Sequence, residues 1–141
     1  MTKALIIEAR YYTHINDLLL TAAKEVFETR SIAYDVVTVP GALEIPAALN
    51  FAVKSRKYDC YVLLGCIIRG ETSHYDVVQN ESARGVYDLV LKHDLALGNA
   101  ILTVENEQQA LARADRLIKN KGGFSAEAAL AMLDMKNKLS A

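Results

Sequence analysis

The chain has 141 residues, 52% of them hydrophobic, and its 16 basic and 17 acidic residues leave a net charge of −1. This length predicts one domain, residues 1–141, with a core of its own, and the well-mixed charges exclude a basic nucleic-acid surface. No apolar run approaches the roughly 20 residues of a membrane-spanning helix, and Met1-Thr2-Lys3 leads into a strand rather than a signal peptide, so we expect a cytoplasmic protein.

Apolar residues alternate between strand and helix spacing along the first half of the chain. Residues 4–7 form a short apolar run, and from Ile15 to Phe27 apolar residues recur at helical spacing along one stripe. A second strand at 35–39 ends at a proline and a glycine. We expect a helix at 45–55, because Pro46 is tolerated in a first turn.

The second half repeats this alternation. We place a strand at 58–67, a helix at 75–93, a strand at 100–103, a helix from 107 to just before Gly122, and a helix at 126–139. Strands that alternate with helices form parallel sheets with both faces covered, connected by right-handed crossovers. The sequence therefore predicts an α/β fold, a three-layer α-β-α sandwich with a four-stranded parallel sheet.

Polar and aromatic side chains follow each predicted strand. Tyr11 and Tyr12 follow the first strand, Glu44 the second, and Glu105 the fourth. The carboxyl ends of parallel strands meet at one edge of the sheet, where open α/β sheets bind ligands. An aromatic face with convergent polar groups suits a planar polar ligand, although each residue alone is equally well explained by packing or by a helix N-terminus.

The loop after the third strand, RGETSH at 69–74, has the most chemically active composition in the chain. A strand-to-helix loop offers free backbone N–H groups and the positive end of a helix dipole. We expect residues 70–73 to hold a phosphate or oxyanion, with His74 as a proton carrier. The alternative is an ordinary polar loop in which Thr72 or Ser73 caps the next helix, but a cap does not explain the flanking Arg69 and His74.

The two cysteines, Cys60 and Cys66, lie on one predicted strand. They share a face but are too far apart along it to form a disulfide. We expect buried, reduced thiols and no metal site, because no metal-ligand spacing is present.

Five segments together resemble the lumazine synthase family. They are ARY at 9–11, VPGALEIPAAL at 39–49, GCIIRGETSHYD at 65–76, ILTVENEQQALARA at 101–114 and NKG at 120–122. The resemblance implies a flavodoxin-like sheet and the penultimate step of riboflavin biosynthesis. In that step 5-amino-6-(D-ribitylamino)uracil and 3,4-dihydroxy-2-butanone 4-phosphate form 6,7-dimethyl-8-ribityllumazine, with release of phosphate and water. It implies no cofactor and no metal.

The resemblance also implies roles for particular residues. His74 matches the residue that transfers protons. The residues that match the pyrimidine and ribityl site are Tyr11, Ala42, Leu43, Glu44, Cys66, Ile67, Ile68 and, from the adjacent subunit, Asn99. The residues that match the phosphate site are Glu71, Thr72, Arg113 from a neighbouring subunit and, more weakly, Lys121.

Three positions depart from the family pattern. Tyr11 stands where a phenylalanine is more common, and Asn99, in an expected loop at 97–100, stands where many members have an aromatic residue. Ala112 stands where a glutamate often lies beside the arginine. A catalytically weak paralogue that only binds lumazine or flavin therefore stays an alternative. A flavodoxin or a receiver domain is disfavoured, because residues 9–15 contain no glycine or acidic cluster.

Composition and resemblance both suggest a homo-oligomer. The mean hydropathy of +0.10 fits buried subunit interfaces, and equally an alanine-rich domain without them. The family forms pentamers with active sites at subunit interfaces, and some members form icosahedral shells. We expect residues 122–125 to be an insertion between the last two helices, as in pentamer-only members, and therefore a free pentamer or a dimer of pentamers.

Overall fold

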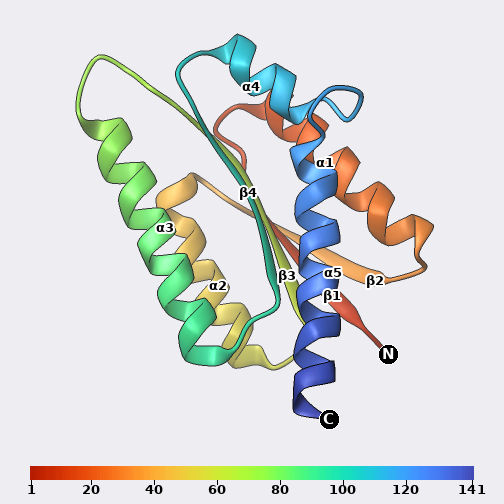
Figure 1. Ribbon diagram of the computed structural model, residues 1–141. Helices are drawn as coiled ribbons and strands as arrows, with labels where there is room; N and C mark the ends of the chain where they lie inside the picture. Colours follow the sequence, from red (N-terminus) through yellow and green to blue (C-terminus); the bar gives the residue numbers. More distant parts are fainter.

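A four-stranded parallel sheet lies at the centre of the computed structural model, which describes residues 1–141, and its strand order is β2-β1-β3-β4 (Figure 1). The strands are β1 (Lys3–Ala9), β2 (Ala33–Val39), β3 (Cys60–Ile68) and β4 (Leu97–Val104). The predicted parallel sheet is confirmed; β1, β2 and β4 extend beyond the predicted runs, whereas β3 begins two residues after the predicted start at 58.

Helices cover both faces of the sheet. Figure 1 shows α1, α4 and α5 on one face and α2 and α3 on the other. The helices are α1 (Thr13–Thr29), α2 (Ile45–Ser55), α3 (His74–His93), α4 (Glu107–Ala114) and α5 (Lys121–Ser140), with a short 3₁₀ turn, η1 (Ala42–Glu44), before α2. The predicted three-layer α-β-α fold is therefore confirmed. None of these helices has both the length and the hydrophobicity needed to cross a membrane.

The core lies on both sides of the sheet because successive strand residues point to opposite faces. Ile6 packs with Leu19 and Phe27 of α1, whereas Ile7 packs with Ile45 and Leu49 of α2. All six side chains are fully buried, and burial of each contributes about 1.5–3 kcal/mol. The sheet is thus held between two apolar layers, and the loops at its carboxyl edge have a rigid base.

The predicted boundary between the last two helices is wrong. Helix α4 ends at Ala114 and α5 begins at Lys121, so residues 122–125 lie in the first turns of α5. Asn120, with φ of 47°, caps α5 by accepting a hydrogen bond from the Gly123 N–H at 3.2 Å. A Cβ on Gly122 would lie 2.4 Å from the Leu19 carbonyl oxygen, so this glycine allows α5 to pack closely on α1. Residues 122–125 are therefore helical, and the connection between α4 and α5 lies at 115–120 instead.

The predicted loop at 97–100 is also wrong, because these residues belong to β4. Asn99 lies opposite Leu63 of β3 in the sheet. Gly98 faces α5 so closely that a Cβ there would lie 1.7 Å from the Ser125 carbonyl oxygen. A glycine that appeared to mark a turn therefore marks the contact between a strand and a helix. Cys60 and Cys66 are free and buried in the same face of the sheet, as predicted.

Candidate active site

A pocket of about 320 Å³ lies at the carboxyl edge of the sheet. Three strand-to-helix connections and the first turns of α3 form it. Its lining residues are Tyr11, Tyr12, Gly41, Ala42, Leu43, Glu44, Cys66, Ile67, Ile68, Gly70, Thr72, His74, Tyr75 and Val78. The sequence placed polar and aromatic residues after each strand, and the structure brings those that follow β1, β2 and β3 together.

The floor of this pocket is apolar. Ala42, Ile67 and Tyr75 form a small buried cluster in which each side chain is 7–8% exposed. Tyr11 lies at the rim, 74% exposed, and its ring meets Tyr12 edge-on with centroids 4.9 Å apart. A planar ligand could thus bury one face against apolar groups while Tyr11 covers another part of it.

The connection after β2 is placed by the helix that follows it. Ile45 and Leu49 are fully buried and anchor α2 against the sheet, and Pro46 is accommodated at the start of that helix. Residues 42–44 therefore form a 3₁₀ turn at a fixed place on the pocket rim. Leu43 and Glu44 are exposed there, so their side chains are accessible to a ligand.

Arg69 holds the connection after β3 in place. Its backbone N–H donates to the Val104 carbonyl at 2.9 Å, and its side-chain Nε donates to Glu105 at 2.6 Å. Its guanidinium carbon also lies 4.2 Å from the centre of the Tyr75 ring. The hydrogen bond to Glu105 is the main cause of a raised Arg69 pKa. Arg69 thus connects the ends of β3 and β4 to the floor of the pocket.

His74 is the first residue of α3, and its imidazole makes no hydrogen bond within the chain, although its backbone N–H donates to Thr72 Oγ1 at 3.2 Å. The exposed ring is therefore free to meet a ligand. Ser73 occupies the N-cap position of α3 without a side-chain capping bond, so of the two predicted caps only Thr72 makes a contact.

Cys66 contributes backbone rather than an active thiol to this site. Its side chain is 7% exposed, and burial raises its pKa from 9.0 to about 11. The thiol therefore stays neutral near pH 7, where a nucleophile or metal ligand needs the thiolate. No three His, Cys, Asp or Glu side chains lie close enough together to hold a metal ion.

Four predicted site residues do not line this pocket within one chain. Glu71 is exposed in the loop between two lining residues. Asn99 donates to the Tyr87 hydroxyl at 3.4 Å and accepts from the Ile101 N–H at 2.8 Å. Arg113 Nη1 donates to the Gln109 carbonyl at 3.1 Å in the last turn of α4, and Lys121 begins α5.

Three lining residues were not among the predicted site residues: Gly41, Tyr75 and Val78. Tyr75 and Val78 are three residues apart in α3, which places them on one helix face. That spacing, directly after His74, was the available signal. Gly41 has no comparable signal beyond its place after Pro40.

Comparison with known proteins matches residues 1–137 to the model of the family described as 6,7-dimethyl-8-ribityllumazine synthase. This match spans the whole sheet and every residue of the pocket. The chain belongs to the 6,7-dimethyl-8-ribityllumazine synthase family. The resemblance inferred from the five sequence segments is therefore confirmed.

Individual relatives of this lumazine synthase family are similar over nearly their full length. A 6,7-dimethyl-8-ribityllumazine synthase from Zymomonas mobilis is 56% identical over 140 residues, covering 99% of this chain and 100% of the relative. The Sphingopyxis alaskensis protein of the same name is 55% identical over 138 residues, covering 98% and 97%. A protein from Rhizobium meliloti, 6,7-dimethyl-8-ribityllumazine synthase 1, is 52% identical over 142 residues, covering 97% and 93%.

Proposed function

We propose that this protein condenses 5-amino-6-(D-ribitylamino)uracil with 3,4-dihydroxy-2-butanone 4-phosphate to 6,7-dimethyl-8-ribityllumazine, in riboflavin biosynthesis. The observation that carries this proposal is one pocket that holds the aromatic Tyr11, the 42–44 turn, the end of β3, and His74. Those groups come from separate connections, yet they match the family positions for one substrate and its proton carrier. Relatives with this enzyme's name share more than half of the residues of the chain.

The pyrimidine substrate binds against the floor of the pocket. Tyr11 stacks on the uracil ring, and the backbone of Cys66, Ile67 and Ile68 hydrogen-bonds its edge. Residues 42–44 hold the ribityl chain at the rim. The buried floor and exposed rim of the pocket support this orientation, because a planar heterocycle gains from apolar contact whereas a polyol stays near water.

The phosphate substrate binds at the first turn of α3. Glu71 and Thr72 form the turn that receives the phosphate, near the positive end of the α3 dipole. Arg113 and Lys121 of a neighbouring subunit complete the site. Arg113 suits this role because its planar guanidinium can form two parallel hydrogen bonds to a phosphate.

The active unit is therefore a homo-oligomer, and we propose a pentamer or a dimer of pentamers. Arg113, Lys121 and Asn99 lie outside the pocket of their own chain, so a neighbouring copy has to supply them. Exposed apolar side chains on α3, including Leu91 at 80% exposure, support a buried subunit interface. We place the enzyme in the cytoplasm, where its separated, buried thiols stay reduced.

The reaction needs several proton transfers and the loss of phosphate. The substrate amine attacks the ketone, the carbinolamine loses water, phosphate leaves, and the ring closes. His74 carries protons in these steps, because an imidazole can both accept and donate a proton. Orientation of two bound reactants supplies much of the remaining rate enhancement.

A catalytically weak paralogue that binds lumazine or flavin is the second candidate. Ala112 and Asn99, which differ from the residues common in the family, favour it. One kinetic experiment separates the two. We expect the purified protein to form lumazine faster than a protein-free mixture of both substrates. Binding of lumazine without any acceleration would establish the binder instead.

A further inference from the structure

Glu8 is the only charged residue whose side chain is buried, with 3% exposure. It lies one residue before the end of β1, a central strand of the sheet. A buried carboxylate loses its hydration and needs close partners to compensate. Such a group is costly at this place, because it follows an apolar run at 4–7 within the same strand.

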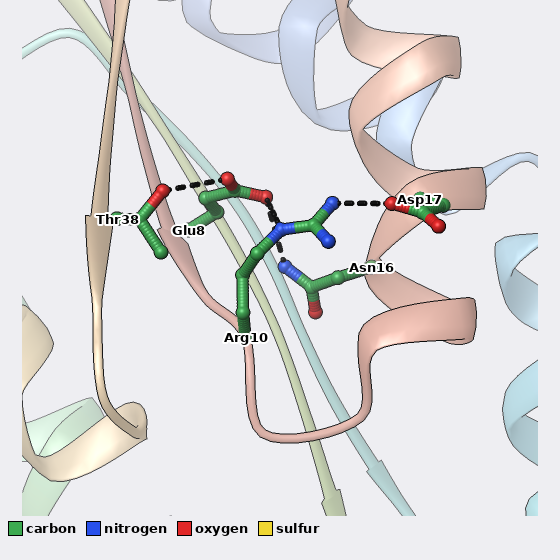
Figure 2. A network of polar contacts seen from close by, with 5 residues as sticks. All are labelled: Glu8, Arg10, Asn16, Asp17 and Thr38. Carbon is green, nitrogen blue, oxygen red and sulfur yellow. Dashed lines mark hydrogen bonds and ion pairs between the residues drawn. The ribbon is translucent and has the colours of Figure 1, made fainter.

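Three side chains surround this carboxylate, one each from β2, α1 and the connection between β1 and α1 (Figure 2). Glu8 accepts hydrogen bonds from Arg10 Nε at 2.9 Å and from Thr38 Oγ1 of β2 at 2.8 Å. A longer bond of 3.3 Å comes from the Asn16 side-chain amide of α1. Glu8 thereby joins β1, β2 and α1 at the edge of the sheet that carries the pocket.

Stability alone is a weak reason for this arrangement. An ionised carboxylate only accepts hydrogen bonds, so the Asn16 amide has to turn its nitrogen toward Glu8. As a result, Asn16 Oδ1 is buried without a hydrogen-bond partner. Well-packed apolar residues often replace buried ion pairs without loss of stability, which points to a positional role for Glu8.

The hydrogen-bond network around Glu8 reaches both sequence neighbours of Tyr11, which are Arg10 and Tyr12. On one side, Arg10 also pairs with Asp17 through Nη2 at 2.6 Å, and its backbone N–H donates to the Val39 carbonyl at 3.3 Å. On the other side, the Tyr12 carbonyl accepts the Asn16 N–H at 3.0 Å. Tyr11 itself makes no side-chain hydrogen bond and is mostly exposed. The place of its ring therefore depends on the backbone on either side of it and on the Tyr12 ring, which it meets edge-on.

We propose that Glu8 is a positioning residue that acts through Arg10 to hold the Tyr11 ring over the pocket, and so sets the affinity for the pyrimidine substrate. This inference rests on the proposed function, which supplies the planar substrate. Glu8 touches no lining residue through its own carboxylate, and it does not act on the reacting atoms.

The first test replaces Glu8 by glutamine, which keeps the shape and removes the charge. We expect the dissociation constant for the ribitylaminouracil, measured by calorimetry, to rise about fivefold to tenfold, part of the loss that follows removal of an aromatic stacking partner. Affinity for the butanone phosphate should stay unchanged. Glu25→Gln is the matched control. Glu25 accepts a hydrogen bond of 2.5 Å from Arg116, and neither residue lines the pocket.

The second test separates positioning from a general effect on the fold. If Glu8 acts through the Tyr11 ring, E8Q should add nothing to the loss already caused by Tyr11→Ala. Equal losses in both backgrounds would overturn the inference, as would wild-type affinity of the single variant. If E8Q does not fold, Thr38→Val removes one partner of Glu8, and we expect a loss of about twofold to threefold in the same direction.

The outcomes for the two proposals are distinguishable. Wild-type protein that fails to bind the ribitylaminouracil would overturn the proposed function, and the inference about Glu8 with it. If the wild-type protein binds and turns over both substrates, and the E8Q and T38V variants bind the ribitylaminouracil with wild-type affinity, the role of Glu8 alone is overturned.

Discussion

The guanidinium carbon of Arg69 lies 4.2 Å from the ring centre of Tyr75, so a cation covers an aromatic side chain of the pocket floor. The ring is 8% exposed and belongs to the floor cluster with Ala42 and Ile67. Because Arg69 also pairs with Glu105, the floor is joined to the loop after β4. Residues 70–74 lie between Arg69 and Tyr75, so this contact joins the two ends of that segment.

Replacement of Arg69 by methionine should raise KM for both substrates about twofold to fivefold, because the cation–π contact and the Glu105 bond are lost together. Steady-state kinetics with each substrate in turn measures this. Arg84→Met is the control, since Arg84 pairs only with Glu81 and Asp88 on the exposed face of α3. Equal kinetics of the R69M and R84M variants would show that the contact does not shape the pocket.

Replacement of His74 by alanine should lower kcat by about 10²-fold, the low end of the roughly 10²–10⁴-fold effect typical of general acid–base catalysis. We expect the low end because orientation of the bound substrates persists. The pH dependence of kcat should change in this variant. His93→Gln, at the far end of α3, should keep the wild-type pH profile. An unchanged pH profile in the H74A variant would remove His74 from the mechanism.

Replacement of Arg113 by alanine should raise KM for the butanone phosphate, because a charge-assisted contact worth about 1.5–3 kcal/mol is removed. KM for the ribitylaminouracil should change little. Arg116→Ala provides a comparison, since Arg116 pairs with Glu25 of its own chain. If KM for the phosphate substrate stays at the wild-type value, Arg113 is a surface residue and no neighbour supplies it.

The buried thiols should make the protein less stable at alkaline pH. Burial raises the pKa of Cys60 and of Cys66 from 9.0 to about 11. Between these values the unfolded chain releases protons that the folded chain keeps, so the free energy of unfolding falls as pH rises. Urea unfolding at several pH values, with Cys60→Ala and Cys66→Ala, measures this. A fall of the same size in the double variant would assign it to other groups.

Gly98→Ala should destabilise the fold by about 1–3 kcal/mol or more, because overpacking against backbone leaves nothing flexible to move. The added Cβ would lie 1.7 Å from the Ser125 carbonyl oxygen, where α5 crosses β4. Gly70→Ala is the matched control, since a Cβ there meets nothing within 4 Å. Thermal unfolding of both variants gives the comparison. A G98A protein as stable as G70A would contradict the close packing of α5 on β4.

Local patterns were enough to predict the sheet and most of the pocket. The apolar run at 58–67 and the polar loop after it place Thr72 and His74 at a strand end from composition alone. The start of α5 was not predictable in this way, because Gly122 lies in its first turn and packs closely against Leu19 of α1. From sequence alone, a glycine predicts the end of a helix, and only its packing partner shows otherwise.

Two parts of the site depend on relationships that a single sequence does not contain. Glu8 faces Thr38 because of the register between β1 and β2, and a glutamate at the end of an apolar run otherwise looks like an exposed edge residue. Arg113 and Asn99 do not line the pocket of their own chain. Their proposed roles therefore depend on a neighbouring copy of the chain rather than on the fold.

The most direct measurement follows lumazine and inorganic phosphate together, in one reaction with both substrates and purified protein, against a protein-free mixture. We expect both products to appear at the same accelerated rate, with the acceleration reduced in the H74A variant. Lumazine formation no faster than in the protein-free mixture, with lumazine still bound by the protein, would contradict catalysis in this pocket and leave a binding protein.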